Sequence, residues 1–438
     1  MLQKSKIILA MLLVVLMSVT AITPVLASDE DPDDNGAILA EGPDNPAKAA
    51  ITKQLLIPVG TTVPSVRFVF DMKGISIDED ESRGKDAPIP GVDDLTIIIN
   101  DVSDISAPVN GIRTITVETL DIFRDIEFDG AGVYVYEITE SRDTNLAIVE
   151  SEDEWLNFSK AKYTLNVYVA NKTDGSGDTY IYAIGTMFTT DHDGTDADGH
   201  KVDATPGIKG DDYRPSQMIF VNDYGRLYGP DRPDNPDPVN YASLFTGKTV
   251  TGIYGDYERY FEFDITLMPP TILDPDLVPE YYKGYVVEGD EVVYDEKVAP
   301  VALWDDDNDR PYIKIFPNAG NKIHLKHGQR LVFMDTPVGT QYEVFEHGVP
   351  HYLASVVVMT NGDEVEIKGE KLGDDLSTEL QHTGETRNSA AFTNARDFVA
   401  PTGLNMKDLP FFVLIALGVG TLVAFVGVTV HRRKRFNR

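Results

Sequence analysis

The sequence of 438 residues contains no cysteine, and it is poor in basic residues and in histidine. Without cysteine there is no disulfide, no thiol nucleophile and no thiolate metal site, so resistance to unfolding must come from other chemistry. Lys and Arg number 38 against 71 acidic residues, a formal net charge of −33. Such a surface repels nucleic acid, which we exclude as a partner.

No motif points to a cofactor or to a metal site. Two acidic loops, 191–200 and 305–309, do not match the twelve-position calcium loop, so we interpret them as solvated turns. The sequence also has no nucleophile elbow and no metal-binding helix motif, so we do not expect an enzyme that acts on an external substrate.

Long apolar runs occur near the two ends of the chain. At the N-terminal end, Lys4 and Lys6 precede the apolar run 7–17, and small residues follow at Val25 and Ala27. This pattern predicts a secretory signal peptide over residues 1–27, and the alternative is an uncleaved membrane anchor.

At the C-terminal end, the apolar run 409–430 is long enough for a transmembrane helix, and a basic tail follows it. The five residues ahead of the run are Val399, Ala400, Pro401, Thr402 and Gly403. Residues 399–438 therefore resemble a cell-wall sorting signal, in the variant read by pilin-type sortases. The resemblance implies that a sortase cysteine attacks the carbonyl of Thr402 and releases Gly403. A plain C-terminal anchor is the alternative.

Between the two ends the pattern is that of β-strands. Apolar residues alternate with polar ones, as in Val66, Phe68 and Phe70, and no long helical period is present. We predict an all-β fold with folded cores, because 42% of the residues are hydrophobic. We divide it into a flexible leader (28–48), an N-terminal domain (49–228), a semi-rigid proline-rich linker (229–240) and a C-terminal domain (241–398) with an insertion (269–310).

The two domains repeat a sparse pattern of lysine, glutamate and asparagine. In each, a lysine lies in an early strand, a glutamate ends a middle strand, and an asparagine follows Phe-x in the last strand. The residues are Lys53, Glu140 and Asn222, then Lys248, Glu346 and Asn394. The strand period of two places each of them on the apolar side of its strand, so we expect each trio to be buried together. Lys48 and Glu137 are rival members, and an exposed position on an edge strand is the alternative for every one.

A buried trio of this kind can react. Desolvation lowers the pKa of a lysine and raises that of a glutamic acid. A neutral amine can then attack the asparagine amide while the glutamic acid polarises its carbonyl and transfers protons. The product is a Lys–Asn isopeptide bond with loss of ammonia, formed in a unimolecular step because the fold holds the groups together. We expect Glu140 and Glu346 to be the catalytic residues of two such cross-links.

The ordered set resembles FctA-type streptococcal backbone pilins. In the first domain the resemblance lies in 132–140, 163–174 and 218–222, and in the second in 248–252, in 337–346 and in Asn394 ahead of the sorting signal. It implies tandem immunoglobulin-like β-sandwiches of the CNA-B/FctA-like type in a shaft subunit at the cell surface, in a fimbrium. Its partners would be a sortase, further copies joined head to tail, tip or base pilins, peptidoglycan and host surface molecules. The alternative is a sortase-anchored adhesin that stays monomeric.

The sequence departs from that family at the lysine that would accept Thr402 of the next subunit. The matching place, just before the last strand of the first domain, is near Pro215 and has no lysine. Lys209 is the nearest candidate and Lys201 the second. Residues 312–318 resemble a further pilin motif whose last residue is a lysine, but in this sequence Asn318 stands at that last position. Polymerisation is therefore less strongly indicated than wall attachment.

Overall fold

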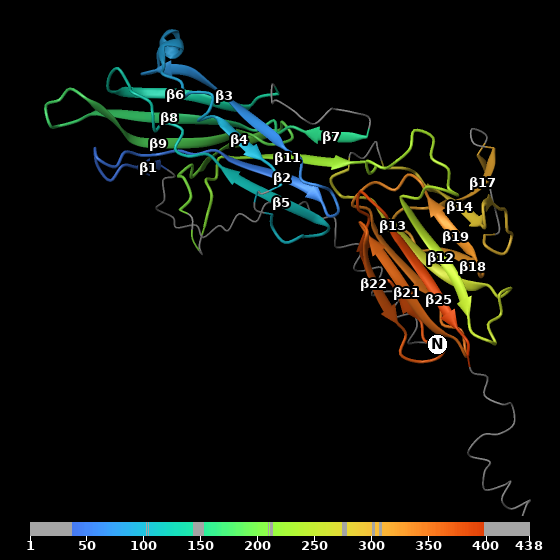
Figure 1. The fold of residues 1–438 in the computed structure, drawn as a ribbon. Helices are drawn as coiled ribbons and strands as arrows, with labels where there is room; N and C mark the ends of the chain where they lie inside the picture. Colours follow the sequence, from blue (N-terminus) through green and yellow to red (C-terminus); the bar gives the residue numbers. More distant parts are fainter. Residues whose placement is uncertain are drawn as a thin grey trace, which may run out of the picture.

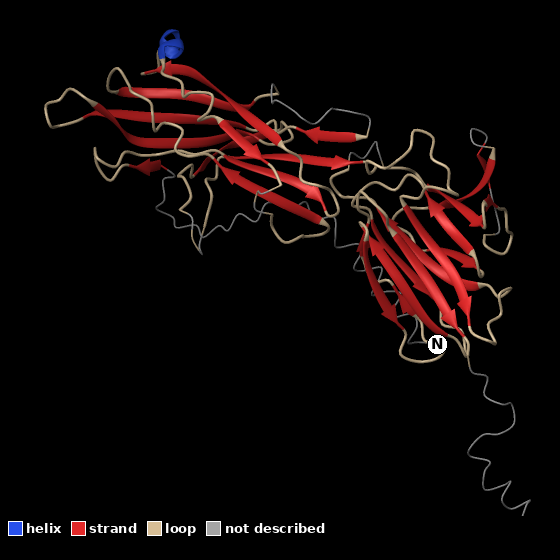
Figure 2. Cartoon of the chain, in the orientation of Figure 1, coloured by secondary structure: helices blue, strands red, loops and turns tan. Residues whose placement is uncertain are grey.

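The computed structural model describes residues 37–397, except 102, 104, 143–152, 209, 211–212, 274–277, 300–302 and 306–308. The described chain forms two units of β-sheet that lie end to end (Figure 1), and each unit has two sheets around a main hydrophobic core. Loops join the strands, and a short 3₁₀ helix, Glu81–Asp86, lies in a connection of the first unit (Figure 2). The prediction of an all-β fold is confirmed.

The first unit has a larger sheet with strand order β1-β9-β8-β6-β3-β4, in which β10 also pairs with β9, and a smaller sheet with order β5-β2-β11-β7. The strands of the larger sheet are β1 (Ala37–Leu39), β3 (Val66–Ile77), β4 (Thr96–Ile99), β6 (Gly132–Glu140), β8 (Lys162–Asn171), β9 (Thr179–Thr190) and β10 (Asp196–Val202). Those of the smaller sheet are β2 (Thr52–Pro58), β5 (Ile112–Glu118), β7 (Glu154–Asn157) and β11 (Ile219–Arg226).

The second unit also pairs a larger and a smaller sheet, of order β16-β17-β14-β19-β12-β25-β21-β22 and β18-β13-β20-β23. The strands of the larger sheet are β12 (Leu244–Thr251), β14 (Tyr282–Glu288), β15 (Glu291–Val292), β16 (Leu303–Asp305), β17 (Arg310–Ile315), β19 (Gln329–Phe333), β21 (Leu353–Thr360), β22 (Asp363–Lys368) and β25 (Ser389–Ala395). Those of the smaller sheet are β13 (Phe261–Met268), β18 (Asn321–Leu325), β20 (Gln341–Glu346), β23 (Leu376–Ser377) and β24 (Gln381–His382).

Alternation of apolar and polar residues explains how each sheet faces its core. In β13 the side chains of Phe261, Phe263, Ile265 and Leu267 are fully buried, and the residues between them are half-buried. A strand with this period must turn one face inward, so two sheets stack face to face and share the core. Polar residues on an inward face are therefore the exceptions that need a partner.

Two segments differ from the organisation expected from the sequence. The acidic leader is predicted to be flexible, but within it β1 pairs antiparallel with β9 and Ala47 is buried. A strand of three apolar residues suffices for this pairing because the edge of β9 offers backbone groups that β8 leaves unpaired. The segment predicted as an insertion, 269–310, supplies β14, which pairs with both β17 and β19 inside the larger sheet.

The joint between the units is centred on the buried carboxylate of Glu385. It accepts hydrogen bonds from the backbone N–H of Thr62 at 2.8 Å and from its Oγ1 at 2.9 Å, and Nη1 of Arg226 lies 3.4 Å from Oε2. The backbones approach so closely that a Cβ on Gly229 would stand 1.7 Å from the carbonyl oxygen of Glu385. Because Thr62 and Arg226 belong to the first unit and Glu385 to the second, charge-assisted hydrogen bonds tie the two together.

Candidate functional site

Each unit places its lysine and its asparagine on two adjacent parallel strands. In the first unit β2 pairs with β11, and Lys53 stands opposite Phe220, two residues before Asn222. In the second unit β12 pairs with β25, and Lys248 stands opposite Phe392, two residues before Asn394. The register is the same in both units. Because Phe-x-Asn places the asparagine two residues after the phenylalanine opposite the lysine, the asparagine lies on the same face of the sheet as the lysine.

The glutamate of each unit reaches this pair from the opposite sheet. In the first unit Nζ of Lys53 lies 2.8 Å from Oε1 of Glu140, and the same oxygen accepts a hydrogen bond from Nδ2 of Asn222 at 2.8 Å. Both ends of the lysine–glutamate pair are fully buried at the side chain, and Asn222 is 1% exposed. The three groups are therefore in direct contact across the core.

The second unit repeats this contact with its own strands. Nζ of Lys248 is hydrogen-bonded to Oε1 of Glu346, and Nδ2 of Asn394 donates to that same oxygen at 3.0 Å. All three residues are buried. Within the described residues, Oε2 of Glu346 and Oδ1 of Asn394 have no hydrogen-bond partner.

An aromatic wall lies against each lysine, and the sequence pattern does not identify it as part of the site. Nζ of Lys53 lies 4.5 Å from the ring centre of Phe68, and Nζ of Lys248 lies 4.1 Å from that of Phe261. The next inward residues, Phe70 and Phe263, stand opposite the two glutamates in the strand register. A Phe-x-Phe in a strand shortly after each lysine is the signal that could have identified this wall.

Burial dominates the electrostatics of both sites. Desolvation, only partly offset by the adjacent glutamate, lowers the pKa of Lys53 to about 8, and it does the same to Lys248. Desolvation also raises the pKa of Glu346, against the opposing effect of Lys248. A lysine with a pKa near 8 has an accessible neutral form, which is the nucleophile.

The glutamate contacts the amide nitrogen of the asparagine in both units. In the first unit the amide orientation is set from two sides, because the backbone N–H of Ser159 donates to Oδ1 of Asn222 at 2.8 Å. The role predicted for the glutamic acid is to polarise the carbonyl. The geometry instead places it beside Nδ2, where it can protonate the leaving nitrogen.

The remaining predicted residues are not gathered at these sites. Lys48 is exposed and Glu137 lies half-buried on the other face of β6, so neither rival joins a trio. Lys201 is exposed on β10. Lys209, the signal peptide and the whole segment 399–438 with Val399, Ala400, Pro401, Thr402 and Gly403 lie outside the described residues. Among the helices of the described part, none has the length and apolar character needed to cross a membrane.

One of the two acidic loops differs from its interpretation as a solvated turn. Asp305 is buried, and its carboxylate accepts from the hydroxyl of Tyr285 at 2.8 Å and pairs with Nζ of Lys283 at 3.0 Å. Over the ranges that the structure describes, no group of three or more His, Asp or Glu could hold a metal ion.

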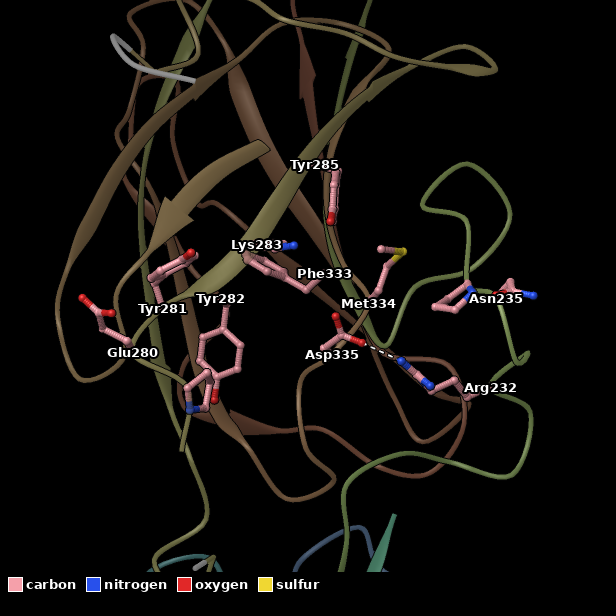
Figure 3. Close-up of a pocket in the computed structure, with 12 residues that line it drawn as sticks. Arg232, Asn235, Glu280, Tyr281, Tyr282, Lys283, Tyr285, Phe333, Met334 and Asp335 are labelled. Carbon is pink, nitrogen blue, oxygen red and sulfur yellow. Dashed lines mark hydrogen bonds and ion pairs between the residues drawn. The ribbon is translucent and has the colours of Figure 1, made fainter. Parts of the chain in front are cut away.

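A cavity of about 490 Å³ opens between the linker and the second unit (Figure 3). Tyr281, Tyr282 and Tyr285 line it, and Nη2 of Arg232 lies 2.9 Å from Oδ1 of Asp335 at its edge. None of the residues of the two trios lines this cavity.

Two stacked-sheet units that each bury a lysine, a glutamate and an asparagine in mutual contact define a class of protein: a tandem β-domain chain with a lysine–asparagine pair inside each domain. The family comparison agrees for the first unit, because residues 51–225 match the FctA family, described as a Spy0128-like isopeptide containing domain. The first unit is therefore similar to that family over these residues. Residues 242–396 match a second family, DUF7601, described as a domain of unknown function.

Similar proteins include pilins and a pilus-presented adhesin. A protein named pilin from Streptococcus pyogenes serotype M1 is 24% identical over 387 residues, which is 87% of this chain and 91% of that one. The crystal structure of the major pilin from Streptococcus pyogenes is 17% identical and covers 81% of this chain and 100% of its own, with a TM-score of 0.29. The crystal structure of the pilus-presented adhesin Spy0125 (Cpa) is 12% identical and covers 79% of this chain, with a TM-score of 0.22. The resemblance to FctA-type backbone pilins is confirmed by the sequence matches.

Proposed function

We propose that this protein is a structural subunit of a covalently polymerised, cell-wall-anchored pilus shaft, and that each unit carries an autocatalytic Lys–Asn isopeptide bond. The bonds join Lys53 to Asn222 and Lys248 to Asn394. We also assign both units to the immunoglobulin-like, CNA-B/FctA-like class of β-sandwich. The protein acts on itself and on no external substrate.

One observation carries the proposal: the same trio recurs in both units with the same parallel register and the same glutamate contact. A buried lysine is costly, and a single satisfied pair in one core could be an accident of packing. Two independent cores that bury the same three groups point to chemistry that both units share. For the second unit, whose family has no described function, the trio supplies one.

The contacts within the first trio support the following proton path. A proton passes from Nζ of Lys53 to Oε1 of Glu140, and the neutral amine attacks Cγ of Asn222, forming the C–N bond and placing negative charge on Oδ1. Glu140 gives its proton to Nδ2, the bond from Cγ to Nδ2 breaks, and ammonia leaves. The attacking nitrogen loses its second proton to Glu140, which ends as the acid. One amide bond replaces another, so no oxidant or cofactor is needed.

Each bond would clamp its unit along the axis of a shaft. The joined strands β2 and β11, like β12 and β25, are adjacent and parallel, so the bond connects the beginning of a unit to its end. In a chain without cysteine this clamp takes the place of a disulfide. The two clamps and the tie at Glu385 suit a subunit that transmits tension.

Assembly would use the C-terminal segment. We propose secretion by the signal peptide, retention of the precursor by the apolar run 409–430, and cleavage by a sortase between Thr402 and Gly403. Thr402 would then be joined to a lysine of the next copy, with Lys209 and then Lys201 as candidates, or to peptidoglycan at the base. Tip or base pilins and host surface molecules are further proposed partners.

A second function is favoured by one observation, the missing lysine near Pro215. A chain with no acceptor lysine would be anchored singly and act as a surface adhesin. Covalent ladders of the protein on the cell surface, lost in Lys209→Ala, would support the shaft; single copies only would support the adhesin.

Intact mass tests the cross-links directly. A recombinant fragment of residues 28–402 should weigh less than its sequence by two ammonia molecules. Glu140→Ala and Glu346→Ala should each restore one. A mass equal to that of the sequence would remove the isopeptide proposal for both units.

A further inference from the structure

The two trios differ in what contacts the carbonyl oxygen of the asparagine. In the first unit the backbone N–H of Ser159 donates to Oδ1 of Asn222 at 2.8 Å and lies 3.2 Å from Oε2 of Glu140. Ser159 is buried in the loop that leads into β8. In the described part of the second unit no donor reaches Oδ1 of Asn394, although that atom is buried.

A small hydrogen-bond network holds the Ser159 amide in place. The Oγ of Ser159 accepts from the backbone N–H of Ala161 at 3.2 Å and lies 2.9 Å from Nδ1 of His192. The backbone N–H of Lys160 donates to the carbonyl oxygen of His192 at 2.9 Å, so the loop is held to both the side chain and the backbone of His192. Desolvation by burial lowers the pKa of His192, which keeps the ring neutral and able to accept the hydroxyl hydrogen.

We infer that the backbone N–H of Ser159 is the oxyanion donor of the first cross-link, with the Ser159 hydroxyl and His192 as positioning groups, and that the first bond therefore forms faster than the second. The inference rests on the proposed isopeptide function. As the amine attacks Cγ of Asn222, the carbonyl electron pair moves onto Oδ1, and a donor already aimed at that atom stabilises the developing charge. Asn394 has no such donor in the described structure, so its oxyanion forms unsupported in the core.

The expected size follows from other oxyanion sites. Removal of one fixed donor slows such reactions by on the order of 10²-fold, so the first bond should form faster than the second by a factor of that order. Loss of the supporting hydroxyl leaves the N–H present but less well held. That change should slow the first reaction by roughly five-fold, the equivalent of one ordinary hydrogen bond.

The test separates the two reactions in the full chain, made by cell-free synthesis in mild detergent. Glu346→Ala leaves the first unit able to react, and Glu140→Ala leaves the second. Synthesis is stopped, samples are quenched in acid over time, and intact mass gives the fraction that has lost ammonia. The rate with Glu346→Ala should exceed the rate with Glu140→Ala.

Three further variants, made in the Glu346→Ala chain, locate the cause. Ser159→Pro removes the N–H and should lower the rate to that of the second unit. Ser159→Ala should lower the rate several-fold. Ser159→Thr keeps the hydroxyl and should react at the rate of the chain with Ser159. Ser216→Ala is the matched control. It removes a buried hydroxyl that donates to the carbonyl of Ala50 at 2.6 Å, without touching the trio, and should leave the rate unchanged.

Each outcome decides something. Loss of no ammonia from any chain would refute the proposed function itself. Two reactions of equal rate, or an unchanged rate in Ser159→Pro, would overturn the role of Ser159 and leave the isopeptide bonds in place. If Ser159→Pro does not fold, two other comparisons test the inference: the rate of the first unit against that of the second, and the rate of Ser159→Ala against that of the chain with Ser159. Equal rates in both comparisons would refute the inference.

Discussion

Asn222→Ala should lower the free energy of unfolding of the first unit by about 6–8 kcal/mol. The bond from residue 53 to residue 222 closes a loop of about 170 residues, and the chain-entropy relation for cross-links assigns about 5 kcal/mol to a loop of that length. The substitution also leaves the buried N–H of Ser159 without its shorter hydrogen bond, which adds roughly 1–3 kcal/mol. The larger part of the effect thus arises in the unfolded chain, which is no longer constrained.

Two comparisons separate the bond from local packing. Glu140→Ala loses the same bond and also buries the amine of Lys53 without its anion, so it should be the more damaging change, by about 3–5 kcal/mol. Asn394→Ala makes the same substitution in the second unit. It should leave the first unit at wild-type stability, because none of its described contacts lies there.

Guanidinium unfolding followed by the fluorescence of Trp155 measures the first unit alone once Trp304 is replaced by phenylalanine. Trp155 lies against β11, with a ring carbon 2.2 Å from where a Cβ on Gly225 would stand. If Asn222→Ala unfolds within about 1 kcal/mol of wild type, or no earlier than Asn394→Ala, the clamp does not contribute as the loop length requires.

Two further predictions concern pH and the joint between the units. Ammonia can leave only while the pair of Lys248 and Glu346 keeps one proton, and that proton is lost as pH rises through the lysine pKa of about 8. The rate of cross-linking in the Glu140→Ala chain should therefore fall about tenfold per pH unit above pH 8. A rate that keeps rising with pH would mean that deprotonation of the amine alone limits the reaction. Glu385→Ala removes the acceptor for Thr62 and one partner of Arg226, which should lower the interaction free energy between the two units by roughly 1–3 kcal/mol. Calorimetry should then show the two units melting separately. A single unchanged transition would contradict this.

The strand period, which is local, determined much of the candidate site. It placed Lys53 and Glu140 on the inward face of their strands, because side chains two residues apart share a face whatever the strand pairs with. Composition alone excluded disulfides and thiol chemistry.

The tertiary structure decided which residues meet, because hydrogen bonds between distant strands leave no periodic trace in the sequence. The parallel register that sets Lys53 opposite Phe220 is one example, and the Phe68 wall from the opposite sheet is another. The Ser159 amide comes from a loop, where no period exists, and a backbone N–H is common to nearly every residue. Burial of Asp305 likewise depends on Tyr285 and a neighbouring lysine folding over it. The sequence by itself determined which groups could react and which way they face, and only the fold decided which of them lie within reach and which asparagine oxygen has a donor.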